Sequence, residues 1–109
     1  MNKELRDMDA VQKWIEGWNA DIFSAGVERA MPLAVHIARE AKELDIAIHC
    51  SEGATTNEVR HEAADIFILL CALCGSYGFS LLEAVKEKMA INDSRTWKAP
   101  DEQGVIEHE

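Results

Sequence analysis

In the sequence EAADIFILLCALC, residues 62–74, two acidic side chains precede a run of nine apolar residues. A helix with apolar residues on nearly every side is buried on most of its surface. The run at 66–74 is far too short to cross a membrane, and it follows directly on an ionisable residue, Asp65. We therefore expect this stretch to be the central, most buried helix of a small helical protein.

Signals on both sides of this stretch give the limits of the central helix. Thr55-x-x-Glu58 is a capping box, which predicts that the helix begins just after residue 55. Gly75 and Gly78 predict its end, because glycine is common where a helix terminates.

A second capping box, Ser80-x-x-Glu83, predicts a further helix over about 81–95. The apolar residues expected to face inward from it are Leu82, Val85 and Met89. The segment 98–109 is polar and reads as a tail.

The N-terminal half contains two more amphipathic patterns. The first has apolar residues at the i, i+3, i+4 and i+7 positions of a helix, and either Asp7 or Asp9 can cap it. Its stripe consists of Val11, Trp14, Ile15 and Trp18. Residues 19–31 read as a loop with at most one short turn, and Pro32 marks the start of the next helix, which runs to about His49. The stripe of that helix consists of Leu33, Ile37, Leu44, Ala47 and Ile48.

These patterns predict an all-α protein with about four helices in a bundle. Residues 1–97 form the single domain, and 98–109 form the polar C-terminal tail. A chain of 109 residues buries only a modest core, and three small amphipathic helices give the central helix little cover. We therefore expect oligomerisation to complete the bundle.

Composition excludes several classes of partner. The formal net charge is −9, and nucleic acids and anionic membranes are bound through basic surfaces, so we expect neither. The first residues lack the apolar core of a signal peptide, which favours a cytoplasmic protein. Cys71 and Cys74 form a C-x-x-C without a second pair of ligands, so we expect core thiols in place of a zinc or redox site.

Two carboxylate pairs are the residues with potential chemistry. Glu40 and Glu43 lie one turn apart, and Glu40 falls in the middle of its helix's apolar stripe. Glu62 and Asp65 repeat this spacing on the central helix. If the two helices are antiparallel, all four carboxylates can meet, and Mg²⁺ or Mn²⁺ would offset their charge. An ordinary solvated acidic face, with the charge serving only solubility, is the alternative.

The order of the two pairs is the first part of a family resemblance. Glu40-x-x-Glu43, then 18 residues, then Glu62-x-x-Asp65, resembles the signature of the MazG-like, all-α nucleoside triphosphate pyrophosphohydrolases. Many members carry a further glutamate directly before the first pair, and here Arg39 stands in its place.

The second part of the resemblance lies near the end of the domain. Lys88, Asn92 and Arg95 have the K-x-x-x-N-x-x-R spacing of that family's closing motif, so the similarity covers 33–97. On a helix these three side chains share a narrow arc, and two cations with an amide suit a triphosphate.

The resemblance implies an enzyme that converts a (d)NTP to the (d)NMP and pyrophosphate, which would suit nucleotide-pool cleansing. It also implies a dimer or tetramer in which neighbouring subunits complete the site. The implied metal ligands are Glu40, Glu43, Glu62 and Asp65, holding two or more ions. Glu43 is our choice for the group that deprotonates water, and Lys88 and Arg95 would offset developing charge. Asn92 would contact the substrate, and Trp14, Trp18 or Phe23 could stack on the base, although the tryptophans could equally be core residues.

Other catalytic signatures are missing from the sequence. It has neither a P-loop nor a G-x-S-x-G nucleophile motif, so phosphate would have to be handled through metal. Glu58-x-x-His61 has the E-x-x-H spacing of di-iron bundles, but a second copy, which that design needs, does not occur. The rival hypothesis is a non-catalytic acidic helical module that binds a basic partner.

Overall fold

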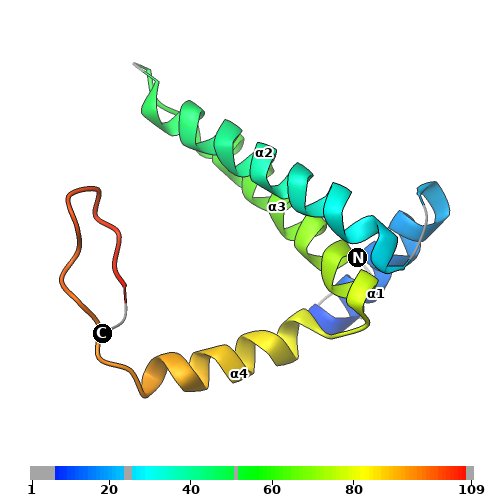
Figure 1. Ribbon diagram of the computed structural model, residues 1–109. Coiled ribbons are helices and arrows are strands. Elements are labelled where there is room, and N and C mark those ends of the chain that lie inside the picture. The colour runs from blue at the N-terminus through cyan, green and yellow to red at the C-terminus, as the bar shows by residue number, and fades with distance from the viewer. Residues whose placement is uncertain (1–6, 24–25, 51, 108–109) are drawn as a thin grey trace.

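The computed structural model describes residues 7–23, 26–50 and 52–107, and it is all-α (Figure 1). Four α-helices and one short 3₁₀ helix follow one another along the chain, which confirms the predicted fold class. They are α1 (Met8–Ile22), η2 (Val27–Arg29), α2 (Ala30–His49), α3 (Thr56–Tyr77) and α4 (Leu81–Asp93).

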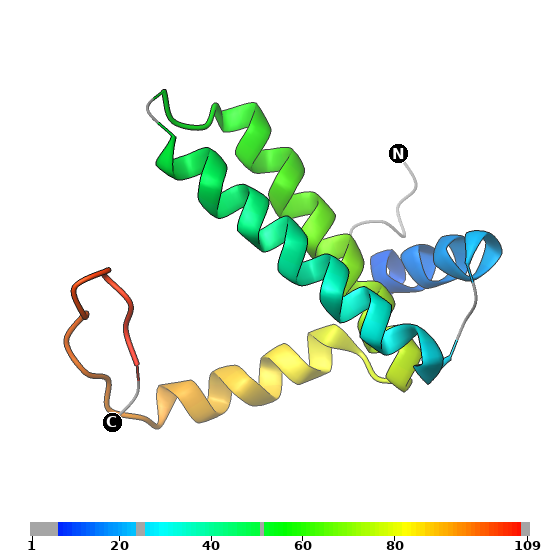
Figure 2. The ribbon, with the colours of Figure 1, turned by 45° about the horizontal axis from the view of Figure 1, so that its top comes forward.

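The centre of the fold is the antiparallel hairpin of α2 and α3, which share the most extensive interface (Figure 1). Helix α1 packs against α3 near the base of this hairpin (Figure 2). Among the described residues, five apolar side chains are buried, and three of them belong to α3. The five are Ile15, Leu33, Cys71, Ala72 and Cys74.

The ends of α3 follow from its sequence, with one correction. Thr55 Oγ1 accepts a hydrogen bond from the Glu58 amide (3.1 Å), and the Glu58 carboxylate accepts one from the Thr55 amide (2.9 Å), so the capping box is confirmed. Gly78 ends the helix in a left-handed conformation at φ 77°. The prediction that Gly75 also ends it was wrong: Gly75 stays helical, and the Glu16 carboxylate of α1 occupies the space that a Cβ would need.

The segment between α1 and α2 is more helical than predicted. Helix α1 continues to Ile22, η2 supplies the one short turn, and α2 begins two residues before Pro32. Pro32 still lies in the first turn, where its missing amide hydrogen costs nothing. Asp7 caps α1, accepting a hydrogen bond from the Asp9 amide (2.8 Å).

The face of α1 that packs inward differs from the predicted apolar stripe. Its buried residues are Gln12, Ile15 and Asn19, two of them polar. The two tryptophans are not core residues, since Trp14 is 62% exposed and Trp18 is 50% exposed.

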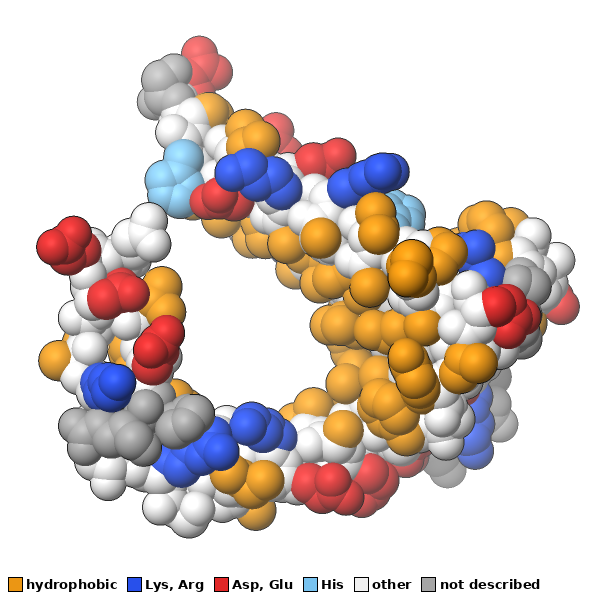
Figure 3. Space-filling model, in the orientation of Figure 1, with side chains coloured by type: hydrophobic (Ala, Val, Ile, Leu, Met, Phe, Trp, Pro, Cys, Tyr) orange, Lys and Arg blue, Asp and Glu red, His pale blue; other side chains and the backbone are white. Residues whose placement is uncertain are grey.

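Helix α4 leaves the bundle at a bend of 99° from α3 and extends away from the hairpin (Figure 2). The structure describes every residue of α4, and none of these residues is buried. The prediction that Val85 and Met89 face inward was therefore wrong within one chain, where they are 43% and 51% exposed. Figure 3 shows hydrophobic side chains gathered on the side of the hairpin that faces the opening toward α4.

Hydrogen bonds from residues of α1 hold the corner between α3 and α4 in place. Gln12 Nε2 donates to the Phe79 carbonyl (2.9 Å), and the Leu81 amide donates to Gln12 Oε1 (2.7 Å). Ser80 Oγ caps α4 by accepting from the Glu83 amide (3.2 Å) and donates to Asp9 Oδ1 (2.6 Å). Among the described residues only this half of the predicted second capping box forms, since the Glu83 carboxylate accepts from Lys86 Nζ (3.4 Å) instead.

Within the described ranges, no single helix has the length and hydropathy of a membrane span. Helices α3 and α4 reach that composition only when they are taken together across their bend.

Candidate metal and nucleotide site

The antiparallel packing of α2 and α3 brings three carboxylates together. One oxygen from each of Glu40, Glu62 and Asp65 lies within 4.8 Å of the other two, so the three could hold a metal ion. Glu40 lies on the face of α2 that packs on α3, and its side chain is only 17% exposed. Glu43 is exposed one turn further along α2 and is not part of this group, so its assignment as a ligand stays a prediction.

The electrostatics of this cluster centre on Glu62. The pKa of Glu62 is raised, first by a hydrogen bond with the Glu40 side chain and then by burial and by the charges of Glu40 and Asp65; His61 acts weakly in the opposite direction. A hydrogen bond between two carboxyl groups needs a shared proton, and a divalent cation would replace that proton.

The cluster also contains an acceptor without a donor. Glu62 Oε2 is buried, and no described residue donates a hydrogen bond to it. Three convergent carboxylates with one unsatisfied oxygen form the donor set that Mg²⁺ or Mn²⁺ prefers. The residues present therefore fit such an ion.

His36 contacts the cluster from α2. Its Nε2 lies 3.2 Å from Glu40 Oε1, one turn away on the same face. A histidine hydrogen-bonded to a ligating carboxylate fixes its orientation. The structure therefore places His36 at the border of the carboxylate cluster.

A cavity of about 260 Å³ opens beside the carboxylates. Two members of the cluster, two aromatic rings and several polar groups share its lining, which consists of Trp18, Asn19, Phe23, Arg29, Leu33, His36, Glu40, Asp65, Ile68, Leu69 and Ala72. The Arg29 guanidinium lies over the Phe23 ring, 5.1 Å from its centroid. The cavity thus brings carboxylates that could hold a metal together with the Trp18 ring, on which a flat ring could stack.

Of the predicted stacking residues, Trp18 and Phe23 line this cavity and Trp14 does not. Trp14 lies in a neighbouring apolar groove of about 300 Å³ between α1 and α3, whose lining is Val11, Trp14, Ile15, Trp18, Ala64, Phe67 and Ile68. Asn19 and Arg29 were not predicted as site residues. Both fall in the segment 19–31 that the sequence presents as a loop, and no motif marks them.

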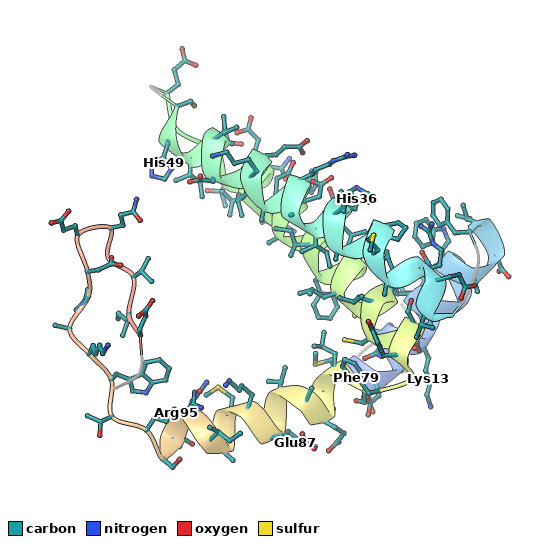
Figure 4. The ribbon with its side chains drawn as sticks, in the orientation of Figure 1. Lys13, His36, His49, Phe79, Glu87 and Arg95 are labelled. Atoms are coloured by element: carbon teal, nitrogen blue, oxygen red, sulfur yellow. The ribbon has the colours of Figure 1, made fainter. Side chains whose placement is uncertain are left out.

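The closing motif lies on the other arm of the molecule. Arg95 follows the end of α4, whereas His36 and the carboxylates lie on the hairpin (Figure 4). Among the described residues, α2 and α4 make no contact. A single chain therefore does not bring Lys88, Asn92 and Arg95 to the carboxylate cluster, and their roles stay predictions.

Comparison with known proteins gives one informative similarity. No protein-family model matches the chain, and no solved structure matches it. Over 89 residues, 81% of its length, the chain is 35% identical to a protein named dATP/dGTP diphosphohydrolase from Salmonella phage PMBT28. The chain spans only about a quarter of that protein, since the aligned part is 27% of its length. The chain is thus a distant relative of part of a protein named as a deoxynucleotide hydrolase.

Proposed function

We propose that this chain is a MazG-like, Mg²⁺-dependent pyrophosphohydrolase that converts a deoxynucleoside triphosphate to its monophosphate and pyrophosphate. The observation that carries the proposal is the shared cavity, in which Glu40 and Asp65 of the carboxylate cluster and the rings of Trp18 and Phe23 line one space. A nucleotide needs both a site for phosphate and a surface for its base. The distant phage relative supports dATP and dGTP as the first substrates to test.

Glu40, Glu62 and Asp65 would hold the metal, with Mn²⁺ as an alternative to Mg²⁺. When bound, the ions neutralise the triphosphate and polarise its α-phosphorus. A triphosphate brings about four negative charges to a site that is already acidic, so we expect two or more ions. His36 holds the Glu40 carboxylate in place through their 3.2 Å contact. Glu43, one turn along α2, is our candidate for the group that takes the proton of the attacking water.

The basic residues of the closing motif would come from a second copy of the chain. Lys88 and Arg95 lie on the α4 arm, away from the carboxylates of their own hairpin (Figure 4). A homodimer or tetramer would let an arm reach a neighbouring hairpin and would cover the apolar surface seen in Figure 3. We propose this arrangement, in a cytoplasmic enzyme whose partners are its nucleotide and its own copies.

A panel of canonical and modified NTPs and dNTPs, incubated with Mg²⁺ or with EDTA and resolved by chromatography, tests the proposal. Monophosphate that forms with Mg²⁺ and is absent with EDTA is the expected result. Diphosphate with orthophosphate would contradict the site of attack. A lack of Mg²⁺-dependent nucleotide binding in calorimetry would favour the non-catalytic acidic module.

A further inference from the structure

The two polar side chains buried in α1 differ in how well they are satisfied. Gln12 is bonded on both sides of its amide, to the Phe79 carbonyl and the Leu81 amide. Asn19 is equally buried, with only 8% of its surface exposed, yet its side chain forms no hydrogen bond with any residue that the structure describes. Neither amide atom of Asn19 is among the buried, unpartnered polar atoms of the described residues, so the exposed remainder of this side chain includes its amide, which can bond a ligand in the cavity that Asn19 lines.

Asn19 lies where a base would be expected. It lines the 260 Å³ cavity together with Trp18 and Phe23, and the Glu40 and Asp65 carboxylates line the same cavity. A nucleotide whose phosphates are held at the carboxylates would extend its base toward the remaining lining. Aromatic faces stack on any base, so discrimination has to come from a polar group.

We propose that Asn19 reads the edge of the purine base in the substrate. This inference rests on the proposed hydrolysis of dATP and dGTP. A side-chain amide presents a donor and an acceptor side by side, which matches the N6–H and N7 or N1 pair of adenine. Rotated by half a turn, the same amide matches O6 and N1–H of guanine. One asparagine therefore accepts both purines.

Replacing the amide by a carboxylate gives a sharp test, because Asp offers two acceptors and no donor. Guanine presents adjacent donors at N1 and N2, whereas adenine presents one donor next to an acceptor. In Asn19→Asp, the ratio of kcat/KM for dGTP to that for dATP should rise about tenfold or more over wild type. The matched control is Asn57→Asp on the exposed first turn of α3, which should leave the ratio unchanged.

A second variant covers the case in which Asn19→Asp fails to fold. Asn19→Ala should lower kcat/KM about tenfold for dATP and dGTP, and by less for the deoxynucleoside triphosphate of unsubstituted purine, which lacks the exocyclic groups. An equal loss on all three substrates, or an unchanged ratio in Asn19→Asp, would overturn the role of Asn19 while wild-type turnover still supports the proposed function. Absence of wild-type turnover on any dNTP would overturn the proposed function itself.

Discussion

Glu62 shows at the scale of a single residue what the metal would do for this protein. Its pKa is raised by the hydrogen bond with Glu40, by burial and by two neighbouring negative charges. The folded state therefore holds the Glu62 proton more tightly than the unfolded chain does. The resulting stabilisation is present below the ordinary pKa of a glutamate, and it is lost as the pH rises through the raised folded-state pKa. At neutral pH the metal-free site works against folding.

The first prediction concerns Glu62→Gln in the presence of EDTA. Removing one of the three crowded charges should raise the Tm above that of wild type at pH 8, and the difference should shrink as the pH falls toward 5. Added Mg²⁺ should raise the Tm of wild type but not of the variant. Differential scanning calorimetry measures both effects, and Glu87→Gln on exposed α4 is the control. A Tm of Glu62→Gln that is lower than that of wild type in EDTA would contradict this account.

The second prediction separates the two glutamates of α2. Glu40→Gln removes a member of the cluster and should lower kcat/KM by about 100-fold or more while circular dichroism stays unchanged. Calorimetry should show weaker Mg²⁺ binding in the same variant. Glu43→Gln tests whether Glu43 is a general base or a metal ligand. Loss of turnover with retained Mg²⁺ affinity would support Glu43 as the base, and loss of Mg²⁺ affinity would support it as a ligand. Full activity of Glu40→Gln would show that the carboxylate cluster is not the active site.

Some residues of the candidate site stand out in the sequence, and others do not. A carboxylate within an apolar helical stripe is conspicuous, and Glu40 was identified in that way. Asn19 and Arg29 were not predicted as site residues, because they belong to no motif and come after the last residue of the apolar pattern that marks α1. Their relevance depends on packing between helices that are distant in sequence, which a single sequence does not display.

At the scale of elements, α1 controls the direction of α4. Gln12 is buried at the corner and bonds both the Phe79 carbonyl, within the connection, and the first amide of α4. Thr55, Gly78 and Ser80 lie at the helix limits that the sequence predicts, because capping signals are local, whereas Gly75 lies within α3. The direction in which α4 leaves was not predicted: its apolar residues suggested an inward face, yet the 99° bend carries them away from the bundle.

The third prediction concerns this corner. Gln12→Ala leaves a carbonyl and an amide without partners, so it should lower the free energy of unfolding by about 2 kcal/mol. Urea denaturation followed by circular dichroism measures the change. Gln103→Ala in the exposed tail is the matched control and should have little effect. Equal stability of the two variants would show that Gln12 does not fix the corner.

At the scale of the whole molecule, one chain consists of two arms, which are the α2–α3 hairpin and helix α4. The hairpin carries the carboxylates, the α4 arm carries Lys88 and Asn92, and apolar side chains line the space between the arms (Figure 3). Many large apolar residues remain exposed, including Ile46 on the hairpin. Such a surface is typical of a subunit that pairs with its copies.

The fourth prediction tests whether the arms exchange between subunits. Glu40→Gln and Lys88→Ala should each be nearly inactive alone. If a dimer exchanges its arms, equimolar mixing after brief unfolding should restore about a quarter of wild-type activity, since half the dimers are mixed and each has one intact site. Light scattering should show a dimer or larger species. A monomer at micromolar concentration, or a mixture that stays inactive, would contradict the exchange.

A ³¹P NMR time course of dATP and dGTP with the wild-type protein and Mg²⁺ in ¹⁸O-labelled water tests the proposed pyrophosphohydrolase activity. Signals of the monophosphate and of pyrophosphate are expected, both abolished by EDTA and by Glu40→Gln. The isotope shift should fall on the phosphorus of the monophosphate, which marks attack at the α-phosphorus. Deoxynucleoside diphosphate with labelled orthophosphate, or turnover that persists in EDTA, would contradict the proposed activity.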